Sequence, residues 1–97
     1  MPASEAQTTF AGHYAAKAVP TGTAEPIASD AKVVTTVVVI TAPKTNTVPV
    51  YIGGSGVTTT DGTPIEPGFS LTLNVRDPSM VYCITTIAAQ ALRVLAV

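Results

Sequence analysis

The segment at residues 32–42, KVVTTVVVITA, most restricts the folds open to this chain. Its residues are almost all β-branched, and β-branched side chains lose rotamer freedom in a helix but pack well on a strand. Val, Thr and Ile occupy both alternating sets of positions, so both faces of such a strand are suited to burial. The segment predicts a central strand of an all-β domain.

A strict alternation over residues 69–76 predicts a second strand. One face would carry Phe69, Leu71, Leu73 and Val75, and the other Ser70, Thr72, Asn74 and Arg76. Such alternation is typical of a half-buried antiparallel strand. Further strands are expected at 48–52, 57–60, 79–87 and 91–97. Because Pro49 cannot donate a ladder hydrogen bond, the strand at 48–52 is expected at a sheet edge or beside a bulge.

Turn signals separate these strands. They are PKTN at 43–46, GGSG at 53–56, Asp61 with Gly62, Pro67 with Gly68, and Asp77 with Pro78. Pro67 and Gly68 suit the central positions of a type II turn, in which glycine accepts a positive φ. Strands with turns at this spacing predict a small antiparallel β-sandwich, Ig-like or jelly-roll-like, of about 6–8 strands.

The C-terminal region admits two interpretations. A helical stripe is formed by Ile84, Ile87, Ala88, Ala91, Leu92 and Leu95. The segment before it, VYCITTI, is strongly β in character, and AAQ can connect two strands. We therefore predict a hairpin of two strands and keep a helix over residues 84–95 as the alternative.

Residues 1–29 differ from the rest of the chain. They are rich in Ala, Thr, Gly and Pro, and no period is sustained. We expect an extended N-terminal arm over 1–29, ordered only where something holds it, and a single sandwich domain over 30–97. Two short strands are expected within the arm, near residues 14–19 and 26–29.

The low charge content indicates that much of the surface is covered. The chain is 46% hydrophobic, 11% charged and carries a net charge of -1, whereas an ordinary domain is about 25% charged. It therefore lacks the basic patch of a nucleic-acid binder. Because interface cores are depleted in charge, the composition favours an assembly subunit, the alternative being a monomer with a Thr-rich surface. The expected interface residues are Phe10, His13, Tyr14, Pro49 and Tyr51.

The sequence offers little for catalysis or metal binding. Cys83 is the single cysteine, so it is expected to be a small buried hydrophobe without a disulfide or a Cys-based zinc site. His13 is the single histidine and lies in the expected arm. Asp61 and Asp77 stand where turn chemistry alone would put them, and an acid/base pair of Asp61 with Glu66 is a weak candidate. We expect no enzyme, no cofactor and no metal.

Two other classes are also disfavoured. The GGSG segment at 53–56 is followed by an expected strand and has no P-loop lysine, so we interpret it as a loop between strands. The N-terminus lacks the basic start and apolar core of a signal peptide, and the apolar C-terminal segment is too interrupted to span a bilayer. We expect a soluble protein, made in the cytoplasm, that binds neither nucleic acid nor membrane.

Residues 48–97 resemble a recurrent module of tailed-phage virion proteins. The likeness lies in VYIGGSGVTTTDGTPIEPGFSLTLNV, followed by DPSMVYCITT and ALRVLAV. Gly53, Gly54, Ser55, Asp61, Gly62, Pro67, Gly68 and Asp77 stand at the positions of the pattern. The chain departs from it after Gly68, where the pattern more often has an acidic residue than Phe69. The resemblance implies a small β-sandwich found as a capsid decoration (cement) protein, head fibre, or neck or tail accessory, and it brings no catalytic residues.

On this resemblance we expect a virion protein at the capsid surface, made in the host cytoplasm. It would bind the assembled shell of major capsid protein, or other virion proteins, as a homo-oligomer such as a trimer, with the arm reaching neighbouring subunits. The strand with Pro49 or the strand at 91–97 would pair with a neighbour's sheet. The alternatives are a tail, neck or head-fibre component, or a module that binds a host-surface glycan through the loops at 53–56 and 61–68.

Overall fold

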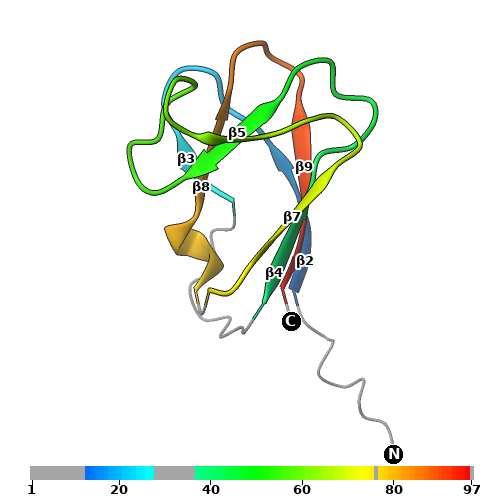
Figure 1. The fold of residues 1–97 in the computed structure, drawn as a ribbon, viewed down its shortest axis with the longest axis vertical. Helices are drawn as coiled ribbons and strands as arrows, with labels where there is room; N and C mark the ends of the chain where they lie inside the picture. Colours follow the sequence, from blue (N-terminus) through cyan, green and yellow to red (C-terminus); the bar gives the residue numbers. More distant parts are fainter. Residues whose placement is uncertain (1–12, 28–36, 76, 97) are drawn as a thin grey trace, which may run out of the picture.

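The protein is a β-sandwich of two four-stranded antiparallel sheets, seen in a computed structural model that describes residues 13–27, 37–75 and 77–96 (Figure 1). The predicted all-β sandwich is confirmed. Sheet I has the order β2 (His13–Ala18), β9 (Ala91–Ala96), β4 (Val38–Thr41), β7 (Ser70–Leu73). Sheet II has the order β3 (Glu25–Pro26), β8 (Tyr82–Thr85), β5 (Val50–Gly53), β6 (Thr63–Ile65). A single 3-10 turn, η1 (Pro78–Met80), precedes β8.

The core lies between the sheets and follows the alternation of the strands. β4 and β5 each place every second residue inward, as does the middle of β9. The fully or almost fully buried side chains include Ile27, Val38, Ile40, Val50, Cys83, Leu92 and Val94. β4 is an interior strand, as predicted, but in its described part only one face is buried. The outer residues Val39 and Thr41 stay partly exposed, and within residues 13–27, 37–75 and 77–96 no further sheet lies on that side of sheet I.

The predicted type II turn at Pro67 and Gly68 is confirmed and is part of a bulge. Phe69 N donates to Glu66 O at 2.9 Å, and Gly68 has a φ of 88°. Gly68 N also donates to Ala42 O at 2.7 Å, while Ala42 N donates to Phe69 O at 3.0 Å. Two residues thus oppose one, which is a β-bulge with glycine at its first position. The bulge breaks the pleat, so Phe69 is 66% exposed rather than inward-facing as predicted, whereas Leu71 and Leu73 do pack on the core.

The two C-terminal strands are present, so the helical alternative over 84–95 is wrong. The predicted hairpin is wrong as well. β8 lies in sheet II and β9 in sheet I, and the segment 86–90 crosses from one sheet to the other. β9 instead pairs with β2 on one side and with β4 on the other. These partners are distant in sequence, which local patterns do not reveal.

The segment 13–27 forms part of the sandwich rather than an extended arm. β2 pairs with β9 from His13 to Ala18, and β3 pairs with β8. The buried side chains of Val19 and Ile27 hold the segment between these strands in the core. β2 confirms the strand expected near 14–19, and β3 overlaps the strand expected near 26–29 at Pro26, with residues 28 and 29 outside the described residues; β2 and β3 are both edge strands. The arm prediction for residues 1–12 lies outside the described residues.

Three predictions about strands need correction. β5 lies between β8 and β6, and β9 between β2 and β4, so neither the strand with Pro49 nor the C-terminal strand is an edge. Pro49 is tolerated because it precedes the first residue of β5, where its carbonyl accepts from Thr85 Oγ1 at 2.9 Å. Residues 59–61 form a turn instead of a strand.

Two buried amides, Asn46 and Gln90, hold the end of the sandwich where the 43–49 and 86–90 segments meet. Asn46 Nδ2 donates to Ala91 O at 2.8 Å, and Ala91 N donates to Asn46 Oδ1 at 2.9 Å. Gln90 Oε1 accepts from Thr47 N at 2.7 Å, and its Nε2 donates to Ala88 O at 3.1 Å. Buried amides of this kind must be hydrogen-bonded, and both are.

Candidate interaction surfaces

Of the interface residues expected from the sequence, only Pro49 and Tyr51 have described side chains. Phe10 lies outside the described residues. His13 and Tyr14 belong to β2 at the edge of sheet I, but their side chains are not among the described ones. Pro49 and Tyr51 are half-buried at the start of β5 in sheet II. Their role as interface residues stays a prediction.

The outer face of sheet II is partly covered by the loop at residues 54–62. The side chain of Val57 is buried and lies against Gly53, because a Cβ added there would come within 2.7 Å of Val57 Cγ2. A Cβ on Gly62 would likewise come within 2.7 Å of Tyr51 Cβ. Tyr51 pairs with Ile84, which is only 6% exposed although it faces outward from the core. The two glycines therefore let the loop lie directly on the sheet.

Hydrogen bonds within the loop use its one carboxylate. Asp61 Oδ1 accepts from Thr58 N at 2.8 Å, and Thr58 Oγ1 accepts from Asp61 N at 3.3 Å. The hydrogen bond from the Thr58 backbone lowers the pKa of Asp61. Asp61 is thus an ionised turn-forming residue, which agrees with the turn chemistry expected for it and disfavours a role as a general acid.

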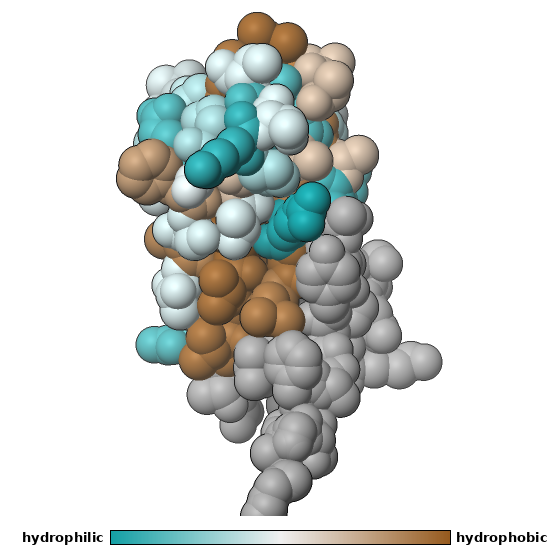
Figure 2. Space-filling view, turned by 90° about the vertical axis from the view of Figure 1, so that its right-hand side faces the viewer, coloured by the Kyte–Doolittle hydropathy of each residue, from teal (hydrophilic) through white to brown (hydrophobic). Residues whose placement is uncertain are grey.

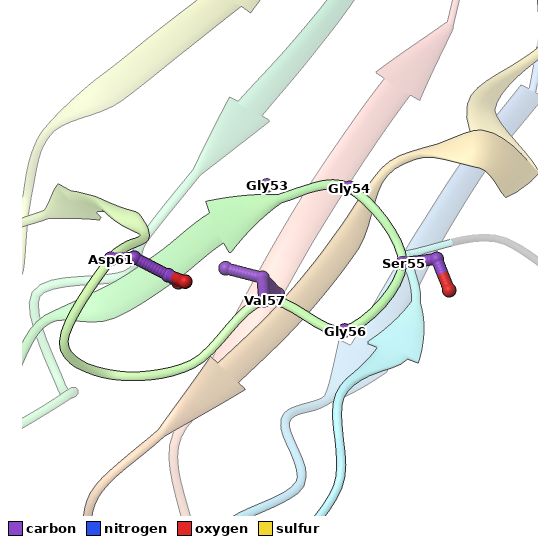
Figure 3. A pocket seen from close by; sticks show the side chains of 6 residues that line it. All are labelled: Gly53, Gly54, Ser55, Gly56, Val57 and Asp61. Atoms are coloured by element: carbon purple, nitrogen blue, oxygen red, sulfur yellow. The ribbon is translucent and has the colours of Figure 1, made fainter.

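An open hollow of about 270 Å³ is lined by Gly53, Gly54, Ser55, Gly56, Val57 and Asp61. Figure 3 shows Val57 and Asp61 pointing into the interior of the loop and Ser55 pointing away from it. No aromatic ring lines the hollow. It is also below the size of about 300–1,000 Å³ that is usual for ligand pockets. These features give a glycan no stacking platform.

Two oppositely charged residues join the edges of the sheets on one side of the sandwich. Lys17 Nζ of β2 and Glu25 Oε1 of β3 form an ion pair at 2.6 Å. In the strand registers Lys17 is opposite the buried Leu92, and Glu25 is opposite the buried Cys83, so both side chains start from the inward face. We call the Lys17–Glu25 ion pair together with the thiol of Cys83 the β2–β3 seam.

The thiol in the seam is not poised for chemistry. Cys83 has no exposed surface, which confirms the prediction of a buried cysteine. Burial raises its pKa from 9.0 to about 11, and the attraction of nearby Lys17 only partly opposes the effect. The thiol is therefore neutral at physiological pH, whereas a nucleophilic cysteine needs a lowered pKa.

The outer face of sheet I presents apolar side chains beside polar ones. Val39 and Leu95 are opposite each other in the β4–β9 register and are both partly exposed. Arg93, two residues from Leu95, is exposed. Figure 2, viewed from the side of sheet I, shows an apolar region next to polar side chains. This is the apolar sheet face that the described part of the protein leaves open.

No protein family, curated protein or solved structure matches this chain. Within residues 13–27, 37–75 and 77–96, no three His, Cys, Asp or Glu side chains gather in a way that could hold a metal ion. The same residues contain no helix that is long and apolar enough to cross a membrane.

The residues that carry the resemblance to phage modules either end β5, as Gly53 does, or lie in the loops and turns that follow it. Gly53 and Gly62 seat the 54–62 loop, and Gly68 forms the bulge. Asp77 Oδ1 accepts from Ser79 N at 2.9 Å and starts η1. The sequence pattern therefore specifies a set of turns. The buried amides Asn46 and Gln90 are outside it, and sequence reasoning did not single them out.

Proposed function

We propose that this protein is a structural component of a tailed-phage virion, most specifically a capsid decoration protein. One observation carries the proposal. The residues that resemble the tailed-phage pattern, from Gly53 to Asp77, shape the loops and turns between β5 and β8 of this sandwich. The resemblance implies a small β-sandwich, and the β-sandwich seen here supports the proposal on that point.

The surface supports a role within an assembly. Only 11% of the residues are charged, and Val39 and Leu95 leave an apolar region on sheet I. A decoration protein that binds the assembled shell but not free subunits stabilises the shell by mass action. Many equivalent copies then need only modest affinity each, because their contacts reinforce one another. The outer face of sheet I is the surface that we assign to the shell.

Co-sedimentation with phage particles tests the proposal. The full chain should sediment with assembled shells of the phage that encodes it and should not bind unassembled major capsid protein. Val39→Lys, which adds a charge to the sheet I face, should reduce shell binding at least tenfold, whereas Ser55→Lys in the exposed loop after β5 of sheet II should not. Binding to isolated tails alone would contradict capsid decoration and favour a tail component. Binding to host glycans without binding to particles would contradict a virion role.

The N-terminal segment can be tested separately. Because β2 begins at His13, the informative deletion is residues 1–12, which leaves every described strand intact. If these residues reach neighbouring subunits, the deletion should leave a folded protein with weakened shell binding. Unchanged shell binding would contradict the arm mechanism and leave the sheet I face as the contact.

A further inference from the structure

The described strands form two sheets with four edges, and three of these edges carry features that discourage pairing with another chain. β3 is two residues long and contains Pro26, and β6 contains Pro64 at its centre. Proline removes the backbone donor that an added strand would need. β2 carries the inward-starting Lys17 of the β2–β3 seam. Short strands, prolines, inward charges and β-bulges are recognised means of blocking sheet edges.

The fourth edge, β7, has none of these features within the strand itself, because its bulge at Gly68 and Phe69 lies before its first residue. Its sequence, SLTL, contains neither proline nor charge. Leu71 and Leu73 pack on the core but are only half-buried. Ser70 and Thr72 are exposed on the other face. An added strand would complete the burial of the two leucines if it brought apolar residues to the same face.

The backbone groups that β7 leaves open follow from its pairing with β4. Ala42 N donates to Phe69 O, and the register continues with Ile40 opposite Leu71 and Val38 opposite Leu73. In an antiparallel ladder every second pair exchanges hydrogen bonds. Leu71 and Leu73 therefore bond to β4, and the N–H and C=O groups of Thr72 point away from the sheet.

We propose that β7 pairs antiparallel with β7 of a second copy of this chain, about a two-fold axis at Thr72. In this self-pairing, side chains of the same sheet face lie opposite each other only when the residue numbers of each opposing pair add to an even number. A slip of one residue would turn the side chains of one copy to the other face. Centring on Thr72 satisfies this condition. Thr72 then exchanges both backbone hydrogen bonds with Thr72 of the second copy.

The side chains fit this self-pairing. On the core face, Leu71 of each copy would lie opposite Leu73 of the other copy. The two leucines of one copy would therefore cover the two leucines of the other. The two Thr72 side chains would meet on the outer face, where Thr–Thr pairs are favourable. A two-fold interface brings identical residues together, so a charged strand would repel itself, whereas β7 is neutral. The dimer would contain one eight-stranded sheet, made of sheet I from each copy, with the apolar outer faces of both copies on the same side. This inference does not depend on the proposed virion role.

Sedimentation velocity of the full chain over a range of concentrations tests the pairing. The wild type should form a dimer as concentration rises. Thr72→Lys places two like charges at the axis and should abolish the dimer, with circular dichroism showing an intact fold. Thr63→Lys, an equally exposed change on the blocked edge β6, is the matched control and should still dimerise. Hydrogen exchange at the backbone amide of residue 72 should be slower in the wild-type dimer than in the T72K monomer.

Several results would overturn the proposal. One such result is a wild-type protein that stays monomeric at all concentrations. This includes the case in which β7 pairs with a strand of another protein and not with a second copy of this chain. Another is a dimer that survives Thr72→Lys, which would place the contact elsewhere. If T72K is misfolded, Thr72→Glu provides a second variant with the same expectation, because it too sets like charges together.

Discussion

At the residue scale, Asn46 replaces a backbone group that the chain lacks. The β4–β9 register, with Thr41 opposite Arg93, would place Pro43 opposite Ala91 if it continued. Proline has no N–H to offer the Ala91 carbonyl. The turn from Pro43 brings Asn46 to that position, and its carboxamide both donates to and accepts from the Ala91 backbone. A side chain thereby extends the sheet by one pair.

Removing that carboxamide should destabilise the fold. Asn46→Ala leaves the N–H and C=O of Ala91 without this partner in a part-buried site, which costs about 1–3 kcal/mol. Urea denaturation should show this loss in the free energy of unfolding. Thr45→Ala, at the exposed neighbouring position, should change it by less than about 0.5 kcal/mol. Equal effects of the two changes would show that the amide has no special role.

Cys83 gives a pH dependence with a definite sign. Its pKa is 9.0 in the unfolded chain and about 11 in the folded protein, so between these values the unfolded chain releases the proton first. The contribution to stability is intact below pH 9 and is lost as the pH rises through about 11. A difference of two pKa units corresponds to about 2.7 kcal/mol.

The comparison that isolates this effect is wild type against Cys83→Ala. Both proteins contain the same tyrosines and lysines, so their common titrations cancel. Urea midpoints measured from pH 8 to 11 should fall more steeply for the wild type. The native thiol should also resist alkylation at pH 8 and react once the protein is unfolded. Parallel midpoint curves, or rapid alkylation of the native protein, would contradict the buried neutral thiol.

At the scale of elements, the sequence predicted what depends on local pattern and failed where partners are distant. The alternation over 69–76 predicted β7, and Pro67 with Gly68 predicted the type II turn before it, but not the bulge. The crossing between β8 and β9, and the placing of β2 beside β9, involve residues far apart in the chain. No local period records such pairings, which is why the hairpin and the arm over 13–27 were wrong.

The surfaces were less predictable than the strands. Pro49 and Tyr51 are expected interface residues on a strand predicted at a sheet edge or beside a bulge, but β5 is interior and the 54–62 loop lies over its outer face. That cover depends on Gly53 and Gly62 having no side chain. In the sequence they are simply glycines in a loop, so their contact role could not be inferred from the residue type alone.

The loop supplies a matched pair of glycine substitutions. Gly62→Ala would force a methyl group to within 2.7 Å of Tyr51 Cβ and 2.9 Å of Val57 Cγ2. We expect a loss of about 1–3 kcal/mol in stability, as for other overpacked sites. At Gly54 a methyl group would meet no atom within 4 Å, so Gly54→Ala should have almost no effect. Thermal unfolding of both variants tests whether the loop packs on sheet II. Equal melting temperatures for the two variants would contradict this packing.

At the scale of the whole molecule, the N-terminal edge strand should be required for the fold. Deleting residues 1–18 removes β2, exposes the edge of β9 and removes Lys17 from the seam. An unprotected β edge invites aggregation. We expect this deletion to lower the melting temperature and the soluble yield, whereas deletion of 1–12 should keep both. Equal stability of the two deletions would show that β2 contributes little to the sandwich.

The low charge of the chain is most informative at this scale. A compact fold with few charges, a partly exposed apolar region on sheet I and an unblocked β7 edge is suited to contact with other chains. The site of the contact on a virion is the central claim to be tested. Cryo-electron microscopy of phage particles with the gene intact and with the gene deleted tests it most directly. The account predicts that density the size of this sandwich is present at regular positions on the capsid surface of the first particles and missing from the second. Identical capsids in the two maps would contradict it.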